Sequence, residues 1–187
     1  MEKRLLIGIS GASGAPIAVA LLRALKQTDV QAHLMITPGG ALTLVRECGM
    51  TAAELEPLAA AVYDIDALGA LPASGTAPFL GMAVVPCSMK TAAGICSGYS
   101  DNLLLRAADV TLKERRKLVL VTRETPLSTL HLRNLYELSQ LGAVILPPVV
   151  SYYTQPRTVE DMTAQVVGKI LDQFQLEAPG YRRWEGL

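Results

Sequence analysis

Two short segments combine glycine and hydroxyl residues in an order suited to binding an anion. The first, Gly8-Ile9-Ser10-Gly11-Ala12-Ser13-Gly14-Ala15-Pro16, directly follows the apolar run Leu5-Leu6-Ile7. The second, Pro86-Cys87-Ser88-Met89-Lys90-Thr91, follows the apolar residues 82–85. A buried strand that ends in small residues and enters a helix directs backbone N–H groups toward a ligand, and the helix dipole favours negative charge there. A tight strand-to-helix turn without a ligand is the alternative interpretation.

The spacing of the glycines separates this pattern from two common nucleotide sites. Glycines at positions 8, 11 and 14 do not form Gly-x-Gly-x-x-Gly, and no Gly-Lys-Ser/Thr follows them. The next expected strand ends at Thr37, where a dinucleotide fold would carry an Asp or Glu for a ribose. The pattern therefore disfavours NAD and favours a hydroxyl contact to a phosphate or a ring.

Charged and aromatic side chains follow several of the expected strands and helices. They are the cations Lys90, Lys113 and Arg123, the carboxylates Glu47 and Glu124, and the aromatic residues Tyr152, Tyr153 and Trp184. This set indicates a phosphate-bearing ligand with a flat apolar ring, next to a second anion held by lysine and arginine. A serine hydrolase is disfavoured, because Ser13 has no evident His or Asp partner. The two histidines, His33 and His131, lie inside an expected strand and an expected helix and are interpreted as structural, and no metal-ligand spacing is present.

Alternating apolar strands and amphipathic helices must position these residues. We expect strands at 4–9, 31–36, 82–85, 118–121 and 143–146. We expect helices at 16–27, 41–48, 101–117, 129–141 and 159–174. The alternation predicts an α/β fold with a doubly wound, mostly parallel sheet in a three-layer αβα arrangement, whose strand ends bring the two loops side by side. Residues 64–78 form a long loop, which is either a lid or subunit contact or a plain surface loop.

Composition limits the class of protein. The 187 residues predict one domain, 1–187, in which about 175–187 form a C-terminal arm. Half of the residues are hydrophobic and 18% are charged, which favours extra burial between subunits. The 17 basic and 17 acidic residues cancel, so we expect neither a nucleic-acid nor a membrane partner. The three cysteines and the lack of a signal-peptide pattern predict a cytoplasmic protein with reduced thiols.

At this point the motifs resemble those of the flavin prenyltransferase family, the UbiX/Pad1 group. The resemblance rests on the two loops above together with 106–116, 118–127, 142–148, 153–156 and the Arg-Arg-Trp tail. It covers almost the whole chain, and its details are most similar to members paired with hydroxyarylic acid decarboxylases (the B-subunit type). The resemblance implies a flavodoxin-like (Rossmann-like), metal-independent homo-oligomer, commonly a dodecamer, with sites at subunit junctions.

The implied reaction joins a dimethylallyl group from dimethylallyl monophosphate to N5 and C6 of reduced FMN. The product, prenylated FMN, would serve a UbiD-type decarboxylase. Two alternatives remain open at this point: a flavin-binding or flavin-delivery subunit without chemistry, and a flavin-dependent cysteine decarboxylase. The second is disfavoured because its family carries a catalytic histidine and a Pro-Ala-Ser-Ala-Asn-Thr loop where this chain has residues 86–91.

The resemblance also implies roles for individual residues. The implied FMN contacts are Gly11, Ala12, Ser13, Thr37, Ser88, Met89, Lys90, Thr91 and Arg123. The implied prenyl-phosphate pocket comprises Lys113, Arg123, Tyr153, Lys169 and Trp184. The implied catalytic residues are Ser13, Glu47, Lys113, Arg123 and Glu124, with Ser13 and Glu47 managing the N5 proton and Glu124 a later proton loss.

Two positions depart from the family pattern. Lys169 stands where many relatives have arginine, which keeps the charge and loses bidentate phosphate geometry. Ala77 stands where relatives often have an aromatic residue, and Phe79 is the candidate replacement that would cover the flavin.

Overall fold

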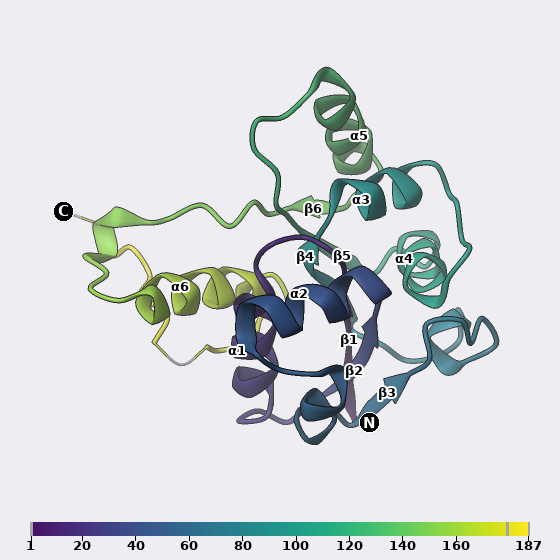
Figure 1. Cartoon of the computed structure of the whole chain (residues 1–187), viewed down its shortest axis with the longest axis horizontal. Coiled ribbons are helices and arrows are strands. Elements are labelled where there is room, and N and C mark those ends of the chain that lie inside the picture. Colours follow the sequence, from purple (N-terminus) through teal and green to yellow (C-terminus); the bar gives the residue numbers. More distant parts are fainter. Residues whose placement is uncertain (1, 179, 187) are drawn as a thin grey trace.

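The computed structural model describes residues 2–178 and 180–186, in which one parallel sheet lies between two layers of helices (Figure 1). The strands are β1 (Lys3–Ile9), β2 (Val30–Ile36), β3 (Ala61–Tyr63), β4 (Gly81–Cys87), β5 (Lys117–Thr122) and β6 (Val144–Ile145). The α-helices are α1 (Ala15–Leu25), α2 (Pro38–Cys48), α3 (Met89–Cys96), α4 (Leu103–Lys113), α5 (Thr129–Gln140) and α6 (Val159–Asp172). Short 3-10 helices are η1 (Ala52–Leu58), η2 (Leu71–Ala73) and η3 (Tyr152–Thr154).

The strand order is β3-β2-β1-β4-β5-β6, and every neighbouring pair is parallel. The chain therefore winds outward in one direction from β1 and in the other from β4, which confirms the predicted doubly wound sheet. Without the short edge strand β3, the order is that of the flavodoxin-like fold. The crevice between the ends of β1 and β4 is the topological switch point, where such sheets bind ligands.

Continuous apolar strands explain why helices cover both faces of the sheet. All seven residues of β4 are buried. In β1, Leu5 and Ile7 pack into the core shared with α1 and α6, whereas Leu6 packs into the core shared with α4 and α5. Successive side chains of a strand point to opposite faces, so a run without polar alternation requires a cover on each side.

Three boundaries differ from the sequence expectation. Helix α2 begins at Pro38 rather than at residue 41, because Thr37 caps it and proline suits a first helical position. Strand β3 precedes the expected loop 64–78, at a place where we expected no strand, and only one of its sides is paired. Helix α4 ends at Lys113, four residues early, because Arg115 adopts φ 56°, a left-handed conformation that stops a helix. Arg115, Arg116 and Lys117 therefore lie beyond the end of the helix that we expected to include them.

The segment between β6 and α6 extends away from the sheet (Figure 1). We call residues 146–158 the arm, and we call the C-terminal segment, which we predicted as a C-terminal arm, the tail. The tail, residues 180–186, lies against α6 and the arm of its own chain, through Gln165 and Thr154.

Candidate active site

The two predicted loops meet at the switch point, and Ser10 joins them. Its buried hydroxyl donates to the Pro86 carbonyl at 3.0 Å and accepts the Ser88 N–H at 2.8 Å. The Ser10 N–H also donates to Pro86 O at 3.2 Å. Ser10 was missing from the predicted site. Its position immediately after β1, facing a neighbouring strand end, is the signal that could have identified it.

Two helices start beside these loops with hydroxyl caps. Thr37 accepts the Gly40 N–H at 3.1 Å and caps α2, and Ser88 accepts the Thr91 N–H at 3.2 Å and caps α3. The hydroxyls of Ser88 and Thr91 lie 3.0 Å apart. Each cap satisfies one N–H of the first turn, and the remaining N–H groups attract an anion at the carboxyl edge of the sheet.

Glycine allows the first loop and the start of α2 to approach backbone to backbone. A Cβ on Gly11 would lie 3.0 Å from the Cα of Gly39, and a Cβ on Gly40 would lie 2.5 Å from the Ile9 carbonyl oxygen. These contacts form a narrow, side-chain-free wall next to two helix starts. The residues present therefore fit a phosphate-bearing, flat ligand such as FMN, and the FMN contacts expected from Gly11, Ala12, Thr37 and residues 88–91 stay predictions.

The start of α1 differs from the expectation. We predicted an anion site there for a ligand, but the carboxylate of Glu47, at the end of α2, already accepts the N–H groups of Gly14 at 2.8 Å and Ala15 at 2.9 Å. Burial alone would raise the pKa of Glu47. Hydrogen bonds from the Gly14 N–H, the Ser13 hydroxyl and the Ala15 N–H, with the charge of Arg123, outweigh it and hold this pKa below its usual value. Glu47 is therefore an ionised carboxylate within reach of Ser13.

Arg123 and Glu124 emerge from the end of β5 at the same edge. The Arg123 N–H donates to the Cys87 carbonyl at 3.3 Å, which fixes the backbone beside the second loop. Both side chains are exposed, and a Glu124 carboxylate oxygen accepts the Thr125 N–H at 3.1 Å. The edge thus brings together Gly11, Ala12, Ser13, Thr37, Glu47, Ser88, Met89, Lys90, Thr91, Arg123 and Glu124.

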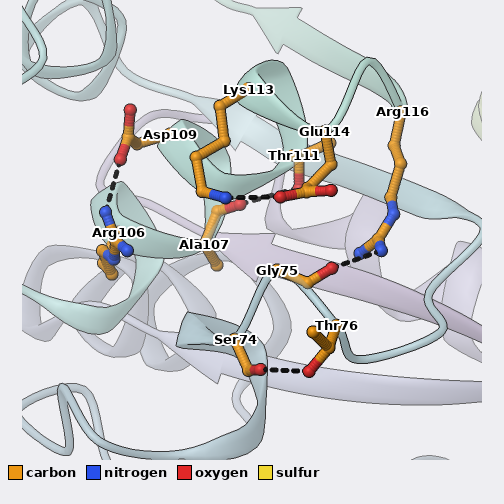
Figure 2. A network of polar contacts seen from close by, with 10 residues as sticks. All are labelled: Ser74, Gly75, Thr76, Arg106, Ala107, Asp109, Thr111, Lys113, Glu114 and Arg116. Carbon is orange, nitrogen blue, oxygen red and sulfur yellow. Dashed lines mark hydrogen bonds and ion pairs between the residues drawn. The ribbon is translucent and has the colours of Figure 1, made fainter.

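Lys113 does not lie at the carboxyl edge of the sheet. It ends α4 directly before β5, whereas Arg123 follows β5, so a six-residue strand of about 20 Å separates them. Figure 2 shows Lys113 paired with Glu114 beside the loop at Gly75, whose carbonyl accepts a hydrogen bond from Arg116 at 2.7 Å. The hydrogen bond from Lys113 lowers the pKa of Glu114. Within one chain, Lys113 and Arg123 therefore lie at opposite ends of β5.

Ala77 and Phe79 follow Gly75 in the same loop. Both side chains are buried in the core on the α4 side of the sheet. Phe79 packs edge-on against His33, with ring centroids 5.1 Å apart. Neither residue is therefore open at the carboxyl edge in this chain, and the suggestion that Phe79 covers a flavin is not supported within a single chain.

Tyr153, Lys169 and Trp184 form a third group, on the arm, α6 and the tail. Tyr153 and Trp184 are 48% and 59% exposed, and their rings meet edge-on with centroids 5.6 Å apart. Lys169 is exposed on α6. The arm extends away from the sheet (Figure 1). The predicted site residues therefore lie in three places on one chain.

The histidines have the structural roles that we predicted. His33 is buried in β2, and its Nδ1 lies 2.8 Å from the Tyr63 hydroxyl. His131 lies in the first turn of α5, where its Nδ1 accepts the Ser128 N–H at 3.3 Å. Across residues 2–178 and 180–186, no three His, Cys, Asp or Glu side chains group as metal ligands. The helices in these ranges are all too short or too polar to cross a membrane.

Comparisons with known proteins agree with this site. The family model described as Flavoprotein matches residues 1–173. A probable UbiX-like flavin prenyltransferase from Streptomyces sp. (strain D7) is 48% identical over 185 residues, covering 98% of this chain and 92% of that protein. The crystal structure of AnUbiX (PadA1) in complex with FMN and dimethylallyl pyrophosphate superposes with a TM-score of 0.98 at 43% identity, over the whole of both chains.

A second solved structure adds a fact about assembly. It is the dodecameric FMN-dependent UbiX-like decarboxylase from Escherichia coli O157:H7, which is 47% identical and superposes with a TM-score of 0.95 over 98% of this chain and 100% of that one. Sequence identity near one half over nearly the full length, together with the close superposition on solved structures, leaves one assignment. The chain belongs to the UbiX/Pad1 family of flavin prenyltransferases.

Proposed function

We propose that the protein transfers a dimethylallyl group from dimethylallyl monophosphate to N5 and C6 of reduced FMN. The observation that carries this proposal is the ionised Glu47 beside Ser13 and Arg123 at the switch point. A protein that only binds or delivers flavin needs the helix starts and the glycine wall. It does not need an acidic side chain placed beside Ser13 and Arg123, so the geometry favours the transferase over a delivery subunit.

The flavin site is formed by the carboxyl edge. The starts of α2 and α3, together with Arg123, hold the phosphate and the polar edge of the ring, and Gly11 and Ala12 let the ligand approach the backbone. When bound and reduced, FMN supplies the nucleophilic N5 and C6 atoms. Glu47 accepts the N5 proton with the help of the Ser13 hydroxyl. The second bond, from C6 to the tertiary prenyl carbon, uses up the double bond: its CH carbon takes up a proton and Glu124 accepts the proton lost from C6, so this step involves no net gain or loss of protons.

The prenyl donor is bound by cations and aromatic faces. During transfer, the bond between the allylic carbon and the phosphate oxygen breaks, and the phosphate leaves with the bonding electrons. Arg123, Lys113 and Lys169 stabilise the departing dianion, and Tyr153 donates a hydrogen bond to it. Trp184 and the tyrosine rings face the developing allylic cation, whose charge is attracted to the π-electrons.

These groups act together only when several copies of the chain assemble. One chain separates Lys113 from Arg123 by the length of β5, and it places Tyr153 on the arm and Lys169 on α6. We infer a homo-oligomer, a dodecamer as in the Escherichia coli relative, with sites at subunit junctions. The exposed apolar residues Leu42, Val45, Val149 and Val150 are suited to such contacts.

The product implies a partner. Prenylated FMN is a cofactor for another enzyme, which we infer to be a UbiD-type (hydroxy)aryl acid decarboxylase in the same compartment, the cytoplasm. The rival activity, flavin-dependent cysteine decarboxylation, lacks its base here, because His33 is buried inside β2 and His131 is bonded to Ser128 in the first turn of α5.

Mass spectrometry of the flavin tests the proposal directly. The protein is incubated anaerobically with FMN, dithionite and dimethylallyl monophosphate, and the molecular mass of the extracted flavin is measured. A gain of one C5 unit is the expected result. Unchanged FMN, despite tight flavin binding, would reject the transferase and leave the delivery subunit as the function.

A further inference from the structure

Gln165 is a buried amide in the middle of α6, 5% exposed, and all of its polar atoms have partners. Its Nε2 donates to the Arg182 carbonyl at 3.0 Å and to the Tyr153 hydroxyl at 3.3 Å, and its Oε1 accepts the Arg182 N–H at 3.3 Å. One side chain thus links the helix, the tail and the arm. A buried amide that lost these partners would bear the full cost of desolvation.

The Arg182 backbone fixes which way the amide points. A main-chain N–H can only donate, so the Gln165 atom that faces it must be the oxygen. The Nε2 group must then face the Tyr153 hydroxyl and donate to it. The tyrosine oxygen is therefore an acceptor toward Gln165, and its own hydrogen is left free to donate to a ligand such as a phosphate oxygen.

Other contacts seat the tail on both sides of this amide. The Tyr181 ring packs where Gly168 leaves α6 without a side chain, since a Cβ there would collide with the ring. Arg183 pairs with Asp172 at 2.6 Å and lies over the Tyr181 ring at 5.1 Å from its centroid. Trp184 then meets Tyr153 edge-on. The tail and Tyr153 are therefore held in one unit, with Gln165 at its centre.

We propose that Gln165 is a positioning residue, which docks the C-terminal tail and orients the Tyr153 hydroxyl as a hydrogen-bond donor toward the phosphate of the prenyl donor. This inference rests on the proposed function for the identity of the phosphate. Gln165 itself does not touch the reacting atoms. It acts through the donor direction of Tyr153 and through the placement of Trp184.

Binding without turnover tests the orientation. Calorimetry measures the affinity of dimethylallyl monophosphate for the protein loaded with oxidised FMN. In Gln165→Leu, which keeps the volume and removes the amide, we expect affinity to fall about tenfold, the value of one oriented hydrogen bond. Gln165→Glu, whose carboxylate accepts the Tyr153 proton, should lose at least as much. FMN affinity should be unchanged, and Gln140→Leu, the same substitution at the exposed end of α5, should behave as wild type.

A double-mutant cycle separates positioning from general damage. In a Tyr153→Phe background, adding Gln165→Leu should cost less affinity than it does in the wild type, because the hydroxyl that Gln165 orients is gone and only the placement of Trp184 is left to lose. Fully additive losses, or wild-type affinity in Gln165→Leu, overturn the proposal. Amide hydrogen exchange of the peptide 180–186 gives a second readout. The amides of this peptide should exchange faster in Gln165→Leu than in Gln140→Leu, and equal rates in the two variants would also overturn the proposal.

The outcomes distinguish this inference from the proposed function. If the wild type binds the monophosphate, Gln165→Leu binds it weakly, and no prenylated flavin forms, then the transferase is rejected and the positioning role stands. If prenylated flavin forms but Gln165→Leu binds the monophosphate as tightly as wild type, then the transferase stands and the positioning role is rejected. A wild-type protein that does not bind the monophosphate would contradict both.

Discussion

Helices α1 and α3 start in similar ways in the sequence and differ in what occupies their first turns. Each follows a buried central strand and a short segment of small and hydroxyl residues. At α3, the local cap Ser88 satisfies one N–H and leaves the others for a ligand. At α1, the N-cap residue Gly14 has no side chain that could cap the helix. The carboxylate of Glu47, 33 residues further along the chain, accepts two N–H groups of this helix start instead.

This comparison shows that the occupant of a helix start, rather than the loop pattern, decides its chemistry. The α3 start presents free donors and is suited to hold an anion. The α1 start holds a carboxylate of the protein itself and keeps it ionised, so its N–H groups are not free for the anion of a ligand. One local pattern thus leaves N–H groups free in one place and binds a side chain of the protein in the other.

The largest effect should come from removing the charge at α1. Glu47→Gln keeps the size of the side chain but cannot accept a proton, so we expect turnover to fall by about 10²- to 10⁴-fold with little change in FMN affinity. Anaerobic rates of prenylated-flavin formation measure this. Glu56→Gln, an exposed glutamate on η1, is the matched control. Near-normal turnover in Glu47→Gln would show that both helix starts serve binding alone.

The next effect tests how α2 brings Glu47 to α1. In Gly40→Ala, the added Cβ meets the Ile9 carbonyl oxygen, which is backbone and cannot rotate away. We expect a loss of about 1–3 kcal/mol in the free energy of unfolding, as for overpacked cores. Urea denaturation measures it, with Gly69→Ala as control because open space surrounds that position. Equal stability of the two variants would mean that α2 shifts without cost.

A smaller effect is expected at α3. Ser88→Ala removes the hydroxyl that accepts the Thr91 N–H, which should lower the free energy of unfolding by about 1 kcal/mol and weaken FMN binding. Thermal unfolding and flavin titration check both values. Ser97→Ala, at the other end of the same helix, should change flavin affinity less. If the two alanine variants bind FMN alike, the α3 start is not a flavin site.

The smallest effect distinguishes the two helix starts by pH. Glu47 has a lowered pKa when folded, so its contribution to stability is present above the usual glutamate value of 4.5 and is lost as the pH falls through the lower folded value. We expect Glu47→Gln to cost up to about 1 kcal/mol at neutral pH and to match wild type in acid. The loss in Ser88→Ala should remain at both pH values. Urea melts at pH 7 and pH 3 compare them.

Much of this fold could be predicted because its signals are local. The hydroxyl cap at Ser88, the apolar runs of β1, β4 and β5, and the structural role of His33 follow from neighbouring residues. The occupation of α1 by Glu47 could not be predicted, since it depends on two glycine-lined backbones approaching each other. The early end of α4 depends on the left-handed Arg115, for which the sequence has no glycine signal.

The separation of Lys113 from Glu47 by a whole strand predicts how defective chains would behave when mixed. In the proposed oligomer, a Lys113→Ala chain retains an intact carboxyl edge, and a Glu47→Gln chain retains an intact α4 end. Each variant alone should be inactive. In mixed assemblies, some junctions would combine the intact carboxyl edge of a Lys113→Ala chain with the intact α4 end of a Glu47→Gln chain. Subunit complementation would therefore restore a fraction of activity, and dilution that dissociates the assembly should abolish it.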